Sequence, residues 1–322
     1  MTPIGEFVVE VNVASFKQLL IDVLPNEFDS VAVSEVRAIM VRVAIGVVLY
    51  KTSKGDLFAL LNSVRNQYGY GDAELVVLVK SNDGTTYDRE LDEFNADSSG
   101  RQPVRILGSV DNCGFGAGHN RLIEHAEEMG ATYYIGCNPD GRLHHSAIGR
   151  FLDATEQNSK DTLFEFLQFP EEHPKGYDHF DGKTRWVAGA CFAARVDFLT
   201  RVGGFDENIR MYCEDVDLSW RVLAEGGECV VLSRCLFYHD MTDRRDRQSV
   251  RIEMLKSGRY LGWKWRNEGF QKIMEDELVR IGVADEARTL PTLSGLQVNY
   301  PIERIEAITE FRRAFSFSPT RW

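Results

Sequence analysis

Three acidic side chains crowd together in residues 211–221, which read MYCEDVDLSWR. Glu214, Asp215 and Asp217 stand at the start of a predicted amphipathic helix, and carboxylates this close repel one another and hold a proton more tightly. A carboxylate with raised proton affinity is what a general base requires. The alternative is an ordinary helix start, because acidic residues there complement the helix dipole and Asp217 could pair with Arg221 one turn later.

Two further segments could hold a metal ion. Asn138, Pro139 and Asp140 follow the apolar run TYYIG at 132–136, and a carboxylate at a strand end suits Mg²⁺ or Mn²⁺. His239 follows another β-rich run, and neutral histidine is a common ligand of divalent metals. Taken singly, each segment has a plainer interpretation: the first as a turn, the second as an ordinary surface or core histidine.

A glycine-rich segment precedes another predicted helix. Residues 111–120 read DNCGFGAGHN, in which Gly114, Gly116 and Gly118 would let the backbone pass close to a ligand. The N-terminus of the following helix would favour an anion such as a phosphate. The glycines lack the G-x-G-x-x-G spacing of a dinucleotide-binding fingerprint, so this segment alone is a weak indication of function.

Alternating strands and helices must position these residues. Apolar runs rich in β-branched and aromatic residues predict strands at 44–50, 74–79, 104–107 and 132–136. Residues with helical spacing lie between them, at 57–64 and 115–129. The alternation predicts an α/β fold, with a mostly parallel sheet and helices on both faces. Ligands of such sheets bind at the carboxyl ends of the strands, which is where the polar motifs fall.

The order of these motifs resembles the rhamnosyltransferase-like branch of the family-two glycosyltransferases. The resemblance runs from about residue 44 to residue 240, and its most specific part is GGFDE at 203–207 followed by EDVDLSWR at 214–221. It implies a GT-A fold, inversion at the anomeric carbon, and a divalent metal, Mn²⁺ or Mg²⁺. It also implies a nucleotide-diphosphate sugar donor, with dTDP-rhamnose first and a UDP-hexose next, and a glycan or lipid-linked glycan as acceptor.

The resemblance assigns roles position by position. Asp140 matches the last carboxylate of the family's D-x-D metal motif, Asn138 takes the place of its first, and His239 matches the second metal ligand. Asp215 matches the catalytic base, with Glu214 beside it. The physical chemistry agrees, since a metal would neutralise the departing diphosphate and an acceptor hydroxyl needs a carboxylate to take its proton.

Further residues are expected to contact the two substrates. The expected donor contacts are Tyr50, Asn82, Asp83, Asn112, Gly114, Phe115, Asn120, Asn138 and Arg244. The expected acceptor contacts are Trp186, Gly189 and Asp217. For Trp186, packing in the core is an equal alternative. The chain departs from the family's V-D-N-G-S pattern, because residues 80–85 read KSNDGT.

Composition excludes several classes of protein. The chain has 322 residues, 43% of them hydrophobic, which is ordinary for a globular protein. Its net charge of −12 argues against nucleic acid as a partner. No apolar run approaches the roughly 18 residues of a membrane span, and the start of the sequence does not resemble a signal peptide. The six cysteines form no C-x-x-C pair and are expected to be reduced thiols, in keeping with a cytoplasmic protein.

Three regions are expected: an N-terminal extension (1–37), a catalytic domain that binds the nucleotide sugar (38–240) and a mainly helical C-terminal extension (241–322). Residues 241–272 hold nine basic and four acidic side chains, a net charge of +5. Their interleaved aromatic residues suit either packing onto the sheet or peripheral contact with the inner face of the cytoplasmic membrane. Arg244 follows His239 closely enough to reach the donor diphosphate instead.

Two other functions share part of this pattern. A nucleotidyltransferase also uses an α/β sheet and a metal, but it would carry a glycine-rich basic loop near its first strand, and residues 48–55 read VLYKTSKG. A non-catalytic nucleotide-sugar-binding module would work with an active partner. The presence of Asp140, Asp215 and His239 argues against that module, and a hydrolysis assay with candidate donors would separate the two.

Overall fold

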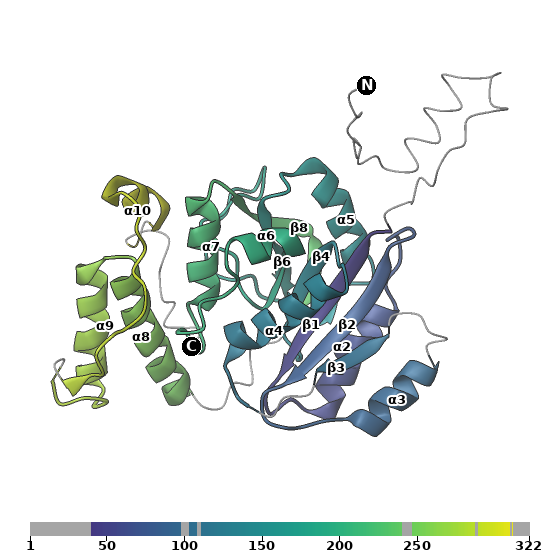
Figure 1. Cartoon of the computed structure of the whole chain (residues 1–322), viewed down its shortest axis with the longest axis horizontal. Helices are drawn as coiled ribbons and strands as arrows, with labels where there is room; N and C mark the ends of the chain where they lie inside the picture. Colours follow the sequence, from purple (N-terminus) through teal and green to yellow (C-terminus); the bar gives the residue numbers. More distant parts are fainter. Residues whose placement is uncertain are drawn as a thin grey trace, which may run out of the picture. The chain divides into compact units, whose positions relative to one another are not determined.

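The computed structural model describes residues 40–97, 103–107, 111–239, 247–286, 289–309 and 311 (Figure 1). The predicted N-terminal extension and Arg244 lie outside these residues. The described residues from Val41 onward belong to one compact unit. No helix in the described ranges is both long enough and apolar enough to cross a membrane.

An eight-stranded sheet runs through this unit, in the order β3-β2-β1-β4-β7-β6-β8-β5. Its strands are β1 (Arg42–Leu49), β2 (Glu74–Ser81), β3 (Val104–Leu107), β4 (Tyr133–Cys137), β5 (Arg142–Leu143), β6 (Thr162–Phe169), β7 (Cys191–Arg195) and β8 (Glu228–Tyr238). The pairs β1–β2, β2–β3, β1–β4 and β6–β8 are parallel, whereas β4–β7, β6–β7 and β5–β8 are antiparallel. Six strands therefore run in one direction, and β5 and β7 run in the other. The predicted α/β class and mostly parallel sheet are confirmed.

The central strands explain the apolar runs seen in the sequence. Every residue of β1 except the first is buried, and the same holds for β2. Strands covered on both faces need apolar side chains on both sides, so their sequences do not alternate. Gly46 lies in the middle of β1, where a Cβ atom would overlap the hydroxyl of Tyr134 on β4, so no larger residue fits without a shift.

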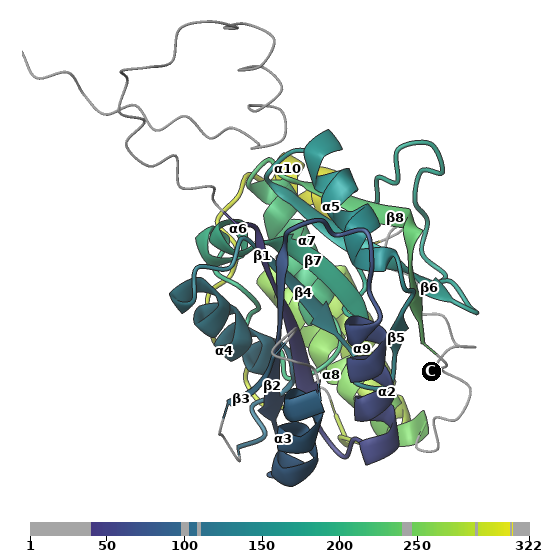
Figure 2. The ribbon, with the colours of Figure 1, turned by 90° about the vertical axis from the view of Figure 1, so that its right-hand side faces the viewer.

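Helices cover both faces of the sheet (Figure 2). They are α2 (Lys54–Arg65), α3 (Asp88–Asp97), α4 (Phe115–Glu128), α5 (Ala147–Gln157), α6 (Val196–Arg201), α7 (Glu214–Ala224), α8 (Arg247–Lys264), α9 (Glu268–Arg280) and α10 (Ile302–Thr309). Apolar side chains of α2 and α5 join one hydrophobic core, and those of α4, α6 and α7 join a second core. The sheet lies between the two cores.

The C-terminal helices α8 and α10 pack against α7. The predicted helical character of the C-terminal extension is confirmed. Leu261 on α8 and the neighbouring Trp265 share a cluster with Trp220 of α7 and Ile305 of α10. Trp265 is fully buried, and Tyr260 is 6% exposed. Packing therefore accounts for these aromatic residues of 241–272.

Candidate functional site

One edge of the sheet gathers most of the predicted site. Because β1, β2, β4 and β8 run in the same direction, their carboxyl ends lie together. Tyr50 follows β1, Asn82 follows β2, Asn138 follows β4 and His239 follows β8. Strand β7 runs the other way, so the residues just before it, including Gly189, reach the same edge. This is where open α/β sheets bind their ligands.

Asp140 and His239 meet at this edge, as the predicted metal pair requires. His239 Nε2 lies 3.3 Å from Asp140 Oδ1 and 3.3 Å from Asn138 Nδ2. The His239 side chain is 2% exposed, whereas that of Asp140 is 49% exposed. A buried imidazole beside a solvent-facing carboxylate leaves the pair accessible from one side.

Gln168 on β6 sets the orientation of the His239 ring. Its Oε1 lies 3.3 Å from His239 Nδ1. An amide oxygen can only accept a hydrogen bond, so in the neutral ring this contact corresponds to a proton on Nδ1 and a lone pair on Nε2. Nε2 lies 3.3 Å from both Asn138 Nδ2 and Asp140 Oδ1, so a cation placed beside its lone pair would be bound by Nε2 and the carboxylate together. Metal-binding histidines characteristically donate their second N–H in this way.

Asp215 lies in the first turn of α7, and two backbone N–H groups hold its carboxylate. Gly189 N donates to Oδ2 at 2.8 Å, and Val216 N donates to Oδ1 at 2.8 Å. Burial raises the pKa of Asp215 to about 6, although both N–H groups favour the anion and lower it. Near neutral pH such a carboxylate is largely ionised and can still accept a proton.

Glu214, next to Asp215, differs from it in how strongly it holds its proton. Its side chain is 5% exposed, and its Oε2 finds no hydrogen-bond partner among the described residues. Burial, followed by the charge of Asp215, raises the pKa of Glu214 well above its usual range. The two carboxyls therefore do not ionise together, and Asp215 carries the charge.

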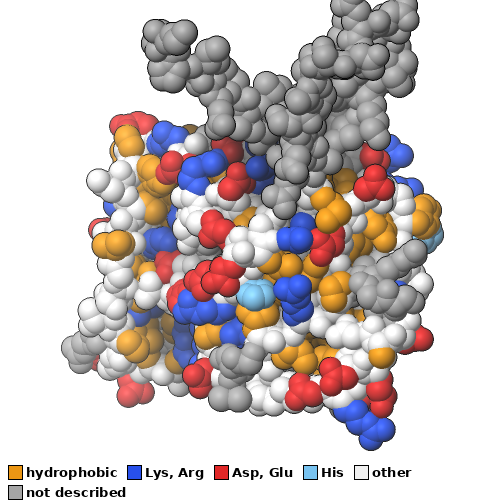
Figure 3. All heavy atoms as spheres, turned by 45° about the vertical axis from the view of Figure 1, so that its right-hand side comes forward, with side chains coloured by type: hydrophobic (Ala, Val, Ile, Leu, Met, Phe, Trp, Pro, Cys, Tyr) orange, Lys and Arg blue, Asp and Glu red, His pale blue; other side chains and the backbone are white. Residues whose placement is uncertain are grey.

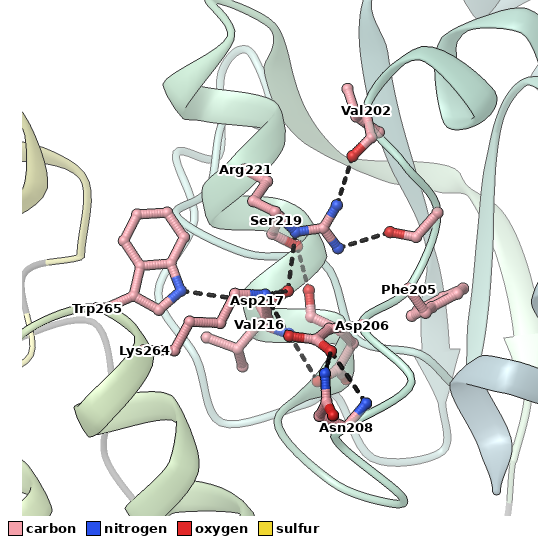
Figure 4. Close-up of polar contacts among 12 residues, drawn as sticks. Val202, Phe205, Asp206, Asn208, Val216, Asp217, Ser219, Arg221, Lys264 and Trp265 are labelled. Carbon is pink, nitrogen blue, oxygen red and sulfur yellow. Dashed lines mark hydrogen bonds and ion pairs between the residues drawn. The ribbon is translucent and has the colours of Figure 1, made fainter. Parts of the chain in front are cut away.

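Asp217, expected at the acceptor, is surrounded by polar partners from α7 and α8 (Figure 4). It is fully buried, and it lies 2.8 Å from Lys264 Nζ and 2.8 Å from Arg221 Nε. Trp265 Nε1 donates to its Oδ1 at 3.0 Å. Lys264 also lies 2.6 Å from Asp206 of the GGFDE motif. This carboxylate thus joins α7 to α8 and does not lie with Gly189 at the sheet edge.

Trp186, also expected at the acceptor, is 8% exposed and packs in the same cluster as Trp220 and Cys213. The ring of His173 lies edge-on to it, with 4.7 Å between the ring centroids. Of the three expected acceptor residues, Gly189 is the one that contacts the candidate base directly.

The glycine-rich segment is bound to the end of β2. Asn82 is 3% exposed and donates from Nδ2 to the carbonyl of Gly114 at 2.8 Å, while Lys80 Nζ donates to Asn82 Oδ1 at 2.5 Å. Asn112 Oδ1 accepts from Gly114 N at 3.2 Å. Gly114 has a φ of 93°, and a Cβ there would collide with the backbone of Arg210, so the position favours glycine strongly. The segment is held rigidly where it enters α4.

Two predicted donor contacts remain exposed at the ends of β1 and β2. Tyr50 is 44% exposed. Asp83 accepts from Lys51 N at 2.6 Å and from Thr85 N at 3.0 Å. Although burial acts to raise it, these hydrogen bonds keep the pKa of Asp83 below its ordinary value. Asp83 is thus a fixed anion beside an exposed aromatic ring, the kind of pair that can orient a nucleoside.

Asn120 performs a packing role in the structure. Its Nδ2 donates to Phe205 O at 2.9 Å, and its Oδ1 accepts from Phe205 N at 2.8 Å. Both ends of the amide are therefore engaged with the GGFDE segment, and a Cβ on Gly204 would clash with Asn120 Oδ1. The neighbouring Phe115 lies nearer the candidate base, since its ring would be 3.2 Å from a Cβ built on Gly189.

Charged side chains of both signs are interspersed on the face shown in Figure 3. The described part of this face shows no broad basic surface. An acidic chain that binds a diphosphate needs positive charge supplied locally, as a metal ion held by Asp140 and His239 would do.

Two residues with polar side chains in buried parts of β6, Glu165 and Gln168, were not predicted. Glu165 forms an ion pair with Lys175, and both side chains are 3% exposed. The sequence did contain a sign of these two residues. In TLFEFLQF, a carboxylate and an amide interrupt an otherwise apolar run, and such groups are buried only when they have partners.

Comparison with known proteins bears on the family resemblance and on the fold. No protein-family model matches the chain. Rhamnosyltransferase WbbL of Escherichia coli (strain K12) is 40% identical over 53 residues, which is 16% of this chain and 20% of that protein. The short match fits the rhamnosyltransferase-like branch that the motifs resemble.

Solved structures identify the fold. S. aureus TarS 1–349 superposes with a TM-score of 0.57 at 14% identity, over 87% of this chain and 73% of that chain. GalNAc-T7 with UDP, GalNAc and Mn²⁺ gives a TM-score of 0.59 at 12% identity, over 85% of this chain and 54% of that chain. TarS 1–349 in complex with UDP-GlcNAc gives 0.56 at 15% identity, over 87% and 74%. These proteins are GT-A glycosyltransferases, and the predicted GT-A fold is confirmed.

Proposed function

We propose that this GT-A protein is an inverting glycosyltransferase, which moves a sugar from a nucleotide diphosphate to a hydroxyl of a glycan or lipid-linked glycan. One observation carries the proposal. The sheet edge that binds ligands in this fold class holds Asp140 and His239 3.3 Å apart, and the residues before β7 connect it to Asp215 through Gly189. Two side chains that can hold a metal ion, and a base on the same edge of the sheet, are suited to transfer of a sugar from a nucleotide diphosphate.

The residues present fit a divalent metal. No group of three or more His, Cys, Asp and Glu side chains in the described ranges could form a complete metal site. Asp140 and His239 would supply two ligands, and Asn138 lies 3.3 Å from the imidazole to adjust its position. Mg²⁺ and Mn²⁺ commonly combine a few protein ligands with substrate phosphates. A bound Mn²⁺ or Mg²⁺ would neutralise charge on the departing diphosphate.

Asp215 would act on the acceptor. As the acceptor oxygen forms its bond to the anomeric carbon, the bond from that carbon to the diphosphate oxygen breaks, and the hydroxyl proton passes to Asp215. The Gly189 and Val216 N–H groups keep the carboxylate from rotating. A single displacement with no enzyme nucleophile inverts the anomeric centre.

The motifs and the comparisons support two candidate donors. The short match to rhamnosyltransferase WbbL supports dTDP-rhamnose as the first candidate. The TarS complex with UDP-GlcNAc supports a UDP-hexose as the next. Tyr50 and Asp83, which are exposed at the ends of β1 and β2, are the residues that we propose contact the nucleoside.

A thermal-shift screen of nucleotide sugars with and without Mn²⁺ tests the proposal first. A ligand that binds only the folded protein raises its melting temperature. Donors that stabilise the protein are then incubated with glycan acceptors, and the free nucleoside diphosphate is measured. Binding without transfer or hydrolysis would indicate a binding module. In a parallel assay with a nucleoside triphosphate and a sugar 1-phosphate, release of pyrophosphate would indicate a nucleotidyltransferase.

A further inference from the structure

A buried ion pair lies behind the segment that holds Asp215. Glu165 is in the middle of β6, and Lys175 is in the segment between β6 and β7. Each side chain is 3% exposed. Two charges this far from solvent are costly unless hydrogen bonds as well as pairing satisfy them. Neither residue has a place in the metal site or the proton transfer proposed above.

Both charges are directed at the backbone of one short segment. Glu165 Oε2 accepts the N–H of Ala188 at 2.6 Å. Lys175 Nζ donates to the carbonyl oxygen of Trp186. The pair therefore holds the N–H of Ala188 and the carbonyl oxygen of Trp186, two residues apart. This restrains both the position and the tilt of the peptide groups between them.

The next N–H along this segment is the one that binds the candidate base. Gly189 N donates to Asp215 Oδ2 at 2.8 Å. On the far side of Gly189, the carbonyl of Ala190 accepts from Asn138 N at 2.9 Å. Gly189 is thus held between the Glu165–Lys175 pair and the end of β4, and a shift of the segment would move its N–H away from the carboxylate.

The pair also acts on Asp215 through its charges. After burial, which is the main cause of the raised pKa of Asp215, Glu165 raises that pKa and Lys175 lowers it. The other ionisable groups beside Asp215 are Glu214, whose pKa is itself raised, and the buried thiol of Cys213. Removing either member of the pair therefore leaves an uncompensated charge near the carboxylate.

We propose that Glu165 and Lys175 are positioning residues for Asp215. Their pairing holds 186–188 in place, so that the Gly189 N–H remains on Asp215 Oδ2 and the carboxylate keeps one orientation. The inference deepens the proposed function and rests on it, because Asp215 serves as a base only in sugar transfer. The geometry itself does not depend on which sugar is moved.

The test measures the titration of Asp215 directly, without any substrate. Protein labelled with ¹³C at aspartate side chains is titrated by NMR, and the Asp215→Asn variant identifies the Asp215 signal. Glu165→Gln keeps an oxygen acceptor for the Ala188 N–H and removes a negative charge near Asp215, so it should move the midpoint to lower pH. Lys175→Met should move it to higher pH for the opposite reason.

A matched control comes from the Lys183–Glu228 ion pair, whose charged atoms lie 2.7 Å apart and whose side chains are 55% and 35% exposed. Glu228→Gln removes the same chemical group from the neighbouring strand β8, and it should leave the Asp215 midpoint unchanged. Equal shifts in Glu165→Gln and Glu228→Gln, or no shift in Lys175→Met, would overturn the proposal.

The double variant Glu165→Gln/Lys175→Met separates positioning from charge and avoids a lone buried ion. In the wild type, the amide proton shift of Gly189 should follow the titration of Asp215. In the double variant that linkage should weaken, and kcat should fall at least tenfold with little change in the donor KM. An unchanged Gly189 response would contradict the proposal. Absence of transfer by the wild type would instead contradict the proposed function and leave the NMR result intact.

Discussion

The Nε2 atom of His239 lies 3.3 Å from Oδ1 of Asp140, although 99 residues separate them in the sequence. They meet because β4 and β8 run in the same direction and deliver their carboxyl ends to one edge. Between them is the place where a divalent cation and a diphosphate would be held together.

The first prediction concerns the metal. EDTA should abolish transfer, and Mn²⁺ or Mg²⁺ should restore it. His239→Ala should weaken Mn²⁺-dependent binding of the nucleoside diphosphate by at least tenfold, measured by calorimetry with and without metal. His125→Ala is the control, because His125 lies on α4 and pairs with Glu128. Full activity in metal-free buffer would refute the metal site.

The second prediction concerns Gln168. Replacing it with leucine removes the acceptor that keeps the His239 ring proton on Nδ1. Loss of such a partner typically weakens metal binding by about 10- to 100-fold. Gln168→Glu retains an oxygen acceptor and should recover much of the affinity. Calorimetric titration with Mn²⁺ in the presence of nucleotide would show whether leucine and glutamate differ; equal affinities would mean that the contact does not orient the ring.

The third prediction concerns the base. Asp215→Asn should lower kcat by at least a thousandfold, while the affinity for the donor changes little, because the base acts on the acceptor. Single-turnover kinetics together with direct binding measurements would separate the two effects. Wild-type turnover in this variant would remove Asp215 from the mechanism.

The fourth prediction concerns pH. The pKa of Asp215 is raised to about 6, so the carboxylate is ionised above that pH and protonated below it. A protonated base cannot accept the hydroxyl proton, so kcat/KM should fall about tenfold per pH unit as the pH drops below about 6. A rate that stays flat down to pH 4.5 would show that no group with this pKa limits transfer.

The fifth prediction concerns stability. Lys264→Met leaves Asp217 buried with one fewer cation, and breaking a buried pair in this way costs about 3–5 kcal/mol. Lys256→Met on the same helix removes an exposed partner of Glu253 and should cost less than about 1 kcal/mol. Urea unfolding of both variants provides the comparison. Similar losses in the two would mean that Asp217 does not depend on Lys264.

The sequence predicted the first half of the sheet well, because β1 to β4 are apolar strands separated by helices. It also placed polar motifs at their ends, and Asp140 and His239 do meet. Strands β5, β6 and β7 were not predicted; β6 reads TLFEFLQF, an apolar run interrupted by a carboxylate and an amide. β5 has two residues and β7 reads CFAAR, too little for a pattern to identify a strand or its direction.

Partners far apart in the sequence account for the remaining differences. The spacing of the acidic residues in 214–217 does not reveal that Asp217 pairs with Lys264, because that contact depends on how α8 packs against α7. The same limit applies to Trp186, for which the sequence left a sugar-stacking surface and packing in the core equally open, and whose ring is buried. Gln168 and Glu165 were visible only as polar interruptions of an apolar strand.

The contacts of Lys264 have a consequence for how the chain folds. One ammonium group from the end of α8 neutralises a carboxylate of the GGFDE segment and a carboxylate of α7 at once. A fragment ending at residue 240 would contain both acids without their shared counter-ion. The sheet and the C-terminal helices are therefore thermodynamically coupled, so that heating should melt them in a single cooperative transition and proteolytic removal of the helices should unfold the sheet as well.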